Sequence, residues 1–185
     1  MGRSNVGKSS LLNALVRRSV ARTSAAPGKT RLANFYRVQR GASPALFLVD
    51  LPGYGYARGG DASAREFKGL VEAYFARAAD PGPEAGSGAR RQERVAIGVL
   101  LLVDSRHPGL ESDMEAWEWL ESQPIPHGVI GTKVDKLSRT ERERHAREFE
   151  TLFDGPVPLV SASTGEGLDE LWKMIVRLPS HNPAA

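Results

Sequence analysis

The chain has 185 residues, enough for one domain, and it contains no cysteine. Hydrophobic residues make up 41% and charged residues 25%, a globular composition that argues against a disordered, collagen-like or coiled-coil chain. The lack of cysteine excludes disulfides, thiolate metal sites and a cysteine nucleophile, and it suits a reducing compartment, so we expect a cytoplasmic protein.

Positive charge is concentrated at the front of the chain. Residues 1–49 hold nine Lys and Arg and no Asp or Glu, whereas residues 50–185 hold 16 basic and 22 acidic residues. The asymmetry predicts anionic ligands, and we expect one phosphate ligand together with a weaker polyanionic partner. For most of these cations, a solvated surface position is the alternative.

The first motif, GRSNVGKS, matches the phosphate-loop pattern G-x-x-x-x-G-K-[ST]. Its glycines let consecutive backbone N–H groups point toward phosphate oxygens, and a helix expected from Lys8 adds its positive end. We expect Lys8 to reach the β- and γ-phosphates and the Ser9 hydroxyl to ligate Mg²⁺. A glycine-rich turn before a helix is the alternative. The candidate residues are Gly2, Arg3, Ser4, Asn5, Val6, Gly7, Lys8 and Ser9.

Residues 19–33 are expected to form a loop after this first helix. Thr30, in the string PGKT, can complete Mg²⁺ coordination with its hydroxyl and contact the γ-phosphate with its N–H group. Such a loop orders with a triphosphate and relaxes with a diphosphate. An ordinary surface threonine is the alternative.

Two strands are expected over residues 34–40 and 45–50, with a turn between them. The second ends in Asp50, and the tripeptide Leu51-Pro52-Gly53 completes the pattern D-x-x-G. A carboxylate at a strand end beside a phosphate loop suits Mg²⁺ bound through water, and the Gly53 N–H can contact a γ-phosphate. Alone, this pattern is common and weak.

The remaining chain alternates apolar runs with amphipathic segments. Helical spacing predicts a helix over residues 67–75, and a Pro/Gly-rich stretch over 80–94 predicts a surface loop. Residues 95–103 are apolar throughout, which is typical of a strand buried on both faces. The order favours an α/β fold with a mainly parallel sheet and helices on both faces. Further elements are expected at 110–120 (helix), 128–131 (strand), 139–153 (helix), 157–160 (strand) and 168–175 (helix).

The string TKVD, residues 132–135, follows one of these strands and is the candidate base-recognition motif. The Asp135 carboxylate can accept hydrogen bonds from N1–H and the N2 amino group of guanine, a pair that adenine lacks. The stem of Lys133 can lie over the base. A solvated turn is the alternative for an isolated tetrapeptide, but its order after two phosphate motifs favours guanine recognition. Backbone N–H groups at Val160-Ser161-Ala162 can contact guanine O6.

These motifs together resemble the EngB (YihA) family of bacterial GTPases, within the TrmE-Era-EngA-EngB-septin-like class. The strings that carry the resemblance are GRSNVGKSSLLNAL, APGKTRLANFY, LVDLPGYGYA, DSRHP and TKVDKL, and only residues 80–94 depart clearly from it. The resemblance implies a three-layer P-loop GTPase domain over residues 1–178, with a disordered tail over 179–185. Besides the phosphate loop, it implies nucleotide contacts at Gly28, Lys29, Thr30, Arg31, Leu32, Asp50, Leu51, Pro52, Gly53, Thr132, Lys133, Val134, Asp135, Val160, Ser161 and Ala162.

The same resemblance implies slow, Mg²⁺-dependent GTP hydrolysis in a switch for large-ribosomal-subunit assembly, linked to normal cell division and septation. Metal ligands are expected at Ser9 and Thr30, with Asp50 acting through water. Lys8, Thr30 and Gly53 are the candidate catalytic residues, and related GTPases with an asparagine at the position of Asn5 use a bound K⁺. Slow turnover is expected because Tyr54 stands where Ras-like proteins place a water-orienting glutamine.

We expect GTP, GDP and the ribosomal large subunit with its rRNA as partners, no membrane or DNA partner, and a monomer. Candidate RNA contacts are Arg17, Arg18, Arg22, Arg31, Arg37 and Arg40. Two other functions stay open at this point: a non-catalytic GTP-sensing module and a P-loop ATPase or kinase of another class.

The strand that normally precedes a phosphate loop is reduced here to Met1. We therefore expect an N-terminally truncated sequence with poor stability and weak nucleotide affinity, both restored by about 30 upstream residues.

Overall fold

The computed structural model describes residues 1–21, 34–41, 45–51, 53, 69, 72 and 97–178. The loop expected over 80–94 and the tail over 179–185 lie outside the described residues. So does the helix expected over 67–75, except for residues 69 and 72, which are helical. None of the helices in the described part of the chain is both long and apolar enough to cross a membrane.

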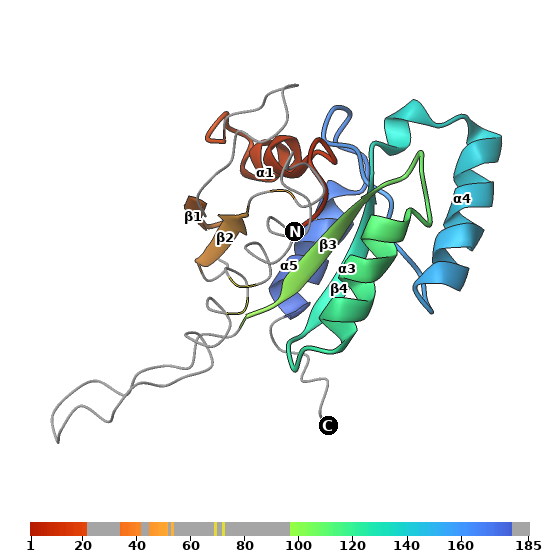
Figure 1. The fold of residues 1–185 in the computed structure, drawn as a ribbon. Helices are drawn as coiled ribbons and strands as arrows, with labels where there is room; N and C mark the ends of the chain where they lie inside the picture. Colours follow the sequence, from red (N-terminus) through yellow and green to blue (C-terminus); the bar gives the residue numbers. More distant parts are fainter. Residues whose placement is uncertain are drawn as a thin grey trace, which may run out of the picture.

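A parallel arrangement of strands forms the centre of the molecule (Figure 1). Strands β3 (Val99–Asp104) and β4 (His127–Thr132) pair in parallel, with Asp104 opposite Thr132 at their carboxyl ends. Gly2 adds a parallel bridge to Leu102, and Leu159 adds one to Gly131. The expectation of a mainly parallel sheet is therefore confirmed for this part of the chain, and all four segments direct their carboxyl ends to one edge.

The strand expected over residues 157–160 is a single bridge instead of a strand. Gly131 donates its N–H to the carbonyl of Pro158, and Val160 donates to the carbonyl of Gly131. Proline lacks an N–H group, so Pro156 and Pro158 cannot extend a hydrogen-bonded ladder here. β3 begins at Val99, later than the apolar run over residues 95–103 suggests. Residues 97 and 98 are described but are not part of the strand.

Helices cover both faces of the parallel strands, which confirms the three-layer fold. The alternate residues Leu101 and Val103 of β3 pack in one cluster with α3 (Glu111–Glu121) and α4 (Arg139–Leu152). Leu102 points the other way and packs with α1 (Lys8–Val16) and α5 (Leu168–Arg177). A strand with apolar neighbours on both faces needs apolar residues at every position, which explains the uninterrupted run.

The hairpin of β1 (Asn34–Val38) and β2 (Leu46–Asp50) is antiparallel. Both strands are shorter than expected: β1 ends at residue 38 instead of 40, and β2 begins at residue 46 instead of 45. β2 contacts α1, and its last residue, Asp50, accepts a hydrogen bond from Ser9 in the first turn of that helix. The hairpin thereby places Asp50 beside the phosphate-loop motif.

Candidate nucleotide-binding site

The phosphate loop runs from the parallel strands into α1, which begins at Lys8 as predicted. Gly7 at the helix start has φ 108°, a conformation that residues with a side chain rarely adopt. Gly2 lies so close to β3 that a Cβ atom there would be 2.7 Å from the carbonyl oxygen of Leu102. Both glycines of the motif are thus required by backbone geometry, and the helix start directs its free N–H groups into the loop.

The ammonium of Lys8 lies inside this loop. It donates hydrogen bonds to the carbonyls of Gly2 (2.8 Å) and Arg3 (2.9 Å). Burial lowers the pKa of Lys8 to about 8, and the charge of Asp50 opposes that shift. A Cβ atom at Gly53 would come within 2.7 Å of this ammonium, so Gly53 lies directly against the loop. The structure therefore brings Lys8 and Gly53 together, as the motifs predict.

Ser9 and Asp50 form the candidate magnesium site. The Ser9 hydroxyl donates to a carboxylate oxygen of the buried Asp50 at 2.9 Å. Hydroxyl and carboxylate oxygens suit Mg²⁺, which takes its other ligands from water and phosphate. In the described part of the chain, no group of three or more His, Asp or Glu residues could hold a metal ion. Residues 28–32, which include Thr30, and Pro52 lie outside the described residues.

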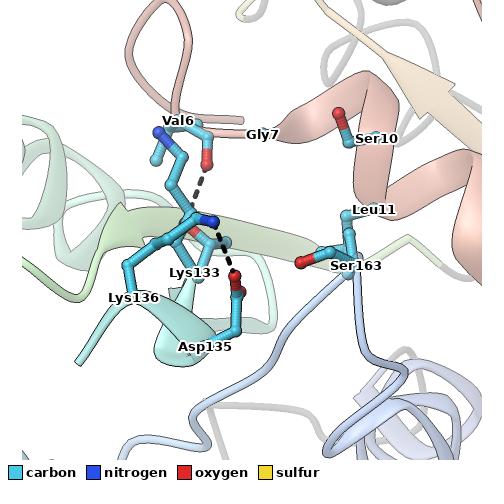
Figure 2. Close-up of a pocket in the computed structure, with 10 residues that line it drawn as sticks. Val6, Gly7, Ser10, Leu11, Lys133, Asp135, Lys136 and Ser163 are labelled. Atoms are coloured by element: carbon cyan, nitrogen blue, oxygen red, sulfur yellow. Dashed lines mark hydrogen bonds and ion pairs between the residues drawn. The ribbon is translucent and has the colours of Figure 1, made fainter. Parts of the chain in front are cut away.

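A cavity of about 230 Å³ lies beside the phosphate loop (Figure 2). Its walls come from three separated parts of the chain: the phosphate loop with α1, the end of β4 with the turn after it, and the segment after the last bridge. The lining residues are Val6, Gly7, Ser10, Leu11, Thr132, Lys133, Asp135, Lys136, Ala162 and Ser163. In Figure 2 the Asp135 carboxylate and the Lys136 ammonium meet on one side, and Leu11 and Ser163 lie on the other. The predicted phosphate and base motifs therefore enclose one space.

Asp135 is held in place by Ser161 of the Val160-Ser161-Ala162 motif. Its Oδ1 atom accepts a hydrogen bond of 2.6 Å from the hydroxyl of Ser161, which is fully buried. This hydrogen bond lowers the pKa of Asp135, although partial burial opposes the shift. The carboxylate is thus ionised at neutral pH and oriented to accept two N–H groups of a base.

The backbone around Ser161 is largely used within the fold. Val160 donates its N–H to Gly131, and Ser161 donates its N–H to Glu166. The predicted contact between this motif and guanine O6 therefore rests on Ala162, which lines the cavity.

Lys133 connects the base-recognition motif to the phosphate loop. Its ammonium donates to the carbonyl of Asn5 at 2.6 Å and to Asp104 at 2.8 Å. The neighbouring Thr132 hydroxyl donates to the carbonyl of Val6 at 2.7 Å. Because the ammonium is fixed at its far end, the aliphatic stem of Lys133 is stretched along the cavity wall, where it can cover a base.

Asp104 is a site residue that the sequence analysis missed. It is buried at the carboxyl end of β3 and accepts hydrogen bonds from Arg106 Nε (2.9 Å) as well as from Lys133. Burial acts to raise the pKa of Asp104, but the bonds from Arg106 and Lys133 outweigh it and hold the pKa far below its ordinary value. The signal was present: like Asp50, Asp104 is an acid that ends an apolar strand.

Arg3 turns its side chain away from the loop. Its Nε atom lies 3.0 Å from both carboxylate oxygens of Asp113, a fully buried residue of α3. Any contact of Arg3 with a phosphate must therefore come from its backbone.

Comparisons with known proteins agree with this geometry. A family model described as a 50S ribosome-binding GTPase matches residues 1–133. A protein of Pelotomaculum thermopropionicum, described as a probable GTP-binding protein EngB, is 44% identical over 95% of this chain and 82% of its own length. A relative with the same description from Thermotoga petrophila is 40% identical over 98% of this chain and 86% of its own.

Solved structures show the same fold at low identity. A probable GTP-binding protein engB superposes with a TM-score of 0.62 at 20% identity, over 97% of this chain and 96% of its own. Era, solved in complex with MgGDPNP and nucleotides of 16S ribosomal RNA, superposes with a TM-score of 0.72 at 22% identity. That match covers 96% of this chain and 54% of the Era chain.

Proposed function

The chain belongs to the EngB family of P-loop GTPases, and we propose that it works as a slow, Mg²⁺-dependent switch in the assembly of the large ribosomal subunit. GTP is then the nucleotide, and hydrolysis to GDP and phosphate is the reaction. One observation carries the proposal: Lys133 and Thr132 join the turn that holds Asp135 to the carbonyls of Asn5 and Val6 in the phosphate loop. Base and triphosphate would therefore be held by one connected unit.

Phosphoryl transfer depends mainly on positioning and on stabilising negative charge. The loop amides and Lys8 hold the phosphates, and Ser9 with Asp50 would hold Mg²⁺, which neutralises charge between the β- and γ-phosphates when it is bound. Gly53 is close enough to Lys8 for its N–H to contact the γ-phosphate. We propose that Thr30 completes the metal site in the GTP state.

The switch is proposed to hydrolyse GTP slowly by itself. Tyr54 follows the D-x-x-G motif and cannot orient water as a glutamine does. Asn5, within the loop motif, has φ 62°, and we propose that its side chain helps to bind K⁺ beside the developing charge.

The proposed action on ribosomal subunits is supported by the basic N-terminal part of the chain and by the family match. Residues 1–49 carry nine cations and no acidic residue, a distribution suited to rRNA. The matching family model is described as a 50S ribosome-binding GTPase. Action on ribosomal subunits places the protein in the cytoplasm, and defective assembly would explain a link to cell division and septation.

Single-turnover GTP hydrolysis tests the proposal. The rate should rise when K⁺ replaces Na⁺ and rise further with purified large ribosomal subunits. In the matched variant Asn5→Ala, the difference between K⁺ and Na⁺ should disappear while GTP still binds. The four conditions are K⁺ or Na⁺, each with and without large ribosomal subunits. Equal rates under all four would contradict the proposal, and no hydrolysis in any of them would favour a non-catalytic GTP sensor.

A further inference from the structure

A buried histidine of α4 binds the main chain directly after β3. The Nδ1 atom of His145 lies 2.7 Å from the carbonyl oxygen of Ser105, and the histidine is only 6% exposed. A carbonyl oxygen only accepts hydrogen bonds, so Nδ1 carries a proton and donates. Figure 1 shows α4 on the side of the molecule away from α1, so this contact reaches the strand end from outside the cavity.

The other ring nitrogen fixes the state of the imidazole. Nε2 of His145 lies 2.9 Å from Nη2 of Arg144. A guanidinium has donors and no acceptor, so Nε2 accepts this hydrogen bond and carries no proton. The two contacts therefore assign a neutral ring with its proton on Nδ1, oriented so that its one N–H group is directed at Ser105.

The carbonyl that His145 binds belongs to a peptide group that also holds Asp104. In a planar trans peptide, the C=O and the N–H groups point in opposite directions. The N–H group of this peptide is that of Arg106, and it donates to Oδ1 of Asp104 at 3.1 Å. The peptide between Ser105 and Arg106 is thus held at its carbonyl by the imidazole and at its N–H by the carboxylate. A rotation of the peptide would weaken both hydrogen bonds.

Asp104 connects this peptide to the cavity. Its Oδ2 atom accepts hydrogen bonds from Nη2 of Arg106 at 2.7 Å and from Nζ of Lys133 at 2.8 Å. Lys133 lines the cavity and also donates to the carbonyl of Asn5. The stem that can cover a base therefore depends on a carboxylate whose own orientation depends on the peptide that His145 binds.

We propose that His145 is a positioning residue for the guanine nucleotide, which orients the peptide after Ser105 and, through Asp104, holds Lys133 against the base. This inference rests on the proposed function, in which GTP is the ligand. His145 is not among the residues that line the cavity. Its loss should therefore weaken nucleotide binding and have much less effect on the rate at which bound GTP is hydrolysed.

Titration with a fluorescent guanine nucleotide tests the inference on the whole chain. His145→Leu and His145→Gln should each weaken binding about 3- to 10-fold, because the hydrogen bond to Ser105 is lost. His145→Asn should keep most of the affinity. The amide nitrogen of asparagine is as many bonds from Cα as Nδ1 of histidine, whereas that of glutamine matches Nε2. Arg144→Ala is the matched control, since it removes only the contact at Nε2, and it should bind like the unmodified chain.

A double-mutant cycle separates positioning from packing. In an Asp104→Asn background, His145→Gln should cause little further loss of affinity, because the path to Lys133 is already broken. Single-turnover hydrolysis at saturating GTP should show a much smaller effect than the affinity. Urea unfolding identifies the variants that are folded, and the comparison of His145→Gln with His145→Asn decides the question if His145→Leu is not.

Unchanged GTP affinity in His145→Gln would overturn the inference. Equal losses in His145→Gln and His145→Asn, or additive effects in the cycle, would assign His145 to packing alone and overturn it as well. The proposed function is tested separately in the unmodified chain. If that chain binds GTP but neither hydrolyses it nor binds large ribosomal subunits, the proposed function fails, while weaker binding by His145→Gln alone would still support the positioning role.

Discussion

Two acidic residues at strand ends have different tasks in the site. Asp50 accepts the Ser9 hydroxyl and is placed for a metal ion, whereas Asp104 accepts the Lys133 ammonium and fixes its position. The sequence predicted the first because a known motif surrounds it. Asp104 carries the same signal, but its importance depends on Lys133, which lies 29 residues further along the chain and meets it only through the pairing of β3 with β4.

We predict that Asp104→Asn weakens GTP binding about 5- to 30-fold, because the loss of one charged hydrogen bond costs about 1–2 kcal/mol. Titration with a fluorescent guanine nucleotide measures the effect. Ser105→Ala is the adjacent control, since the Ser105 hydroxyl is buried and has no hydrogen-bond partner among the described residues. It should leave nucleotide affinity unchanged. An Asp104→Asn protein with unaltered affinity would show that Lys133 needs no such support.

The lowered pKa of Lys8 predicts pH-dependent nucleotide binding. In the free protein this pKa is about 8, and bound phosphates favour the charged form and raise it. Binding should therefore take up a proton near pH 8, and GTP affinity should fall by up to about 10-fold per pH unit above that value. The free energy of unfolding changes in the opposite direction and rises as pH increases past 8. The buried Lys8 then loses its proton, and the cost of burying a charged ammonium disappears.

Calorimetry with saturating Mg²⁺, in buffers of different ionisation enthalpy, measures this proton uptake. Uptake should be clear near pH 8 and small near pH 6.5. If no proton is taken up at either pH, the Lys8 ammonium is already fully charged in the free protein.

At the scale of elements, long-range polar contacts tie the phosphate loop to its surroundings. Thr132 and Lys133 connect it to the end of β4, and Arg3 connects it to Asp113 of α3. The start of α1 at Lys8 was predicted because the motif itself ends a loop and begins a helix. The Arg3–Asp113 pair was not predicted, because the two residues lie 110 positions apart and nothing local marks α3 as the partner.

We predict that Arg3→Met destabilises the protein by about 2–4 kcal/mol, because it removes the Arg3 guanidinium that is paired with the buried Asp113 carboxylate. The double variant Arg3→Met/Asp113→Leu should recover most of that loss, since no buried charge then remains. Urea unfolding of both single variants and the double variant gives the coupling energy. Additive effects would mean that the two residues act independently.

The layered arrangement of the whole molecule is explained by a central sheet that is apolar on both faces. The uninterrupted run before Asp104 predicted the central strand and the helices on both sides of it. Strand ends were predicted less well: Pro158 limits the last strand to one bridge, which pattern alone did not reveal. The exposure of Phe35 and Phe47 was also not foreseen, because an apolar residue in a strand sequence does not reveal which face is covered.

At the same scale, the pocket combines three segments from distant parts of the chain, and we propose that it is the guanine-nucleotide site. Asp135 should select guanine, because adenine has no N–H pair that matches an ionised carboxylate there. Asp135→Asn should shift the preference from GTP to xanthosine triphosphate, whose base offers an oxygen where guanine has an amino group.

Isothermal titration calorimetry with GTP and ATP in the presence of Mg²⁺ tests this assignment most directly. We expect GTP to bind, ATP to bind at least about 100-fold more weakly, and the Asp135→Asn variant to prefer xanthosine triphosphate. Equal or tighter binding of ATP by the unmodified chain would contradict the guanine-nucleotide site described above.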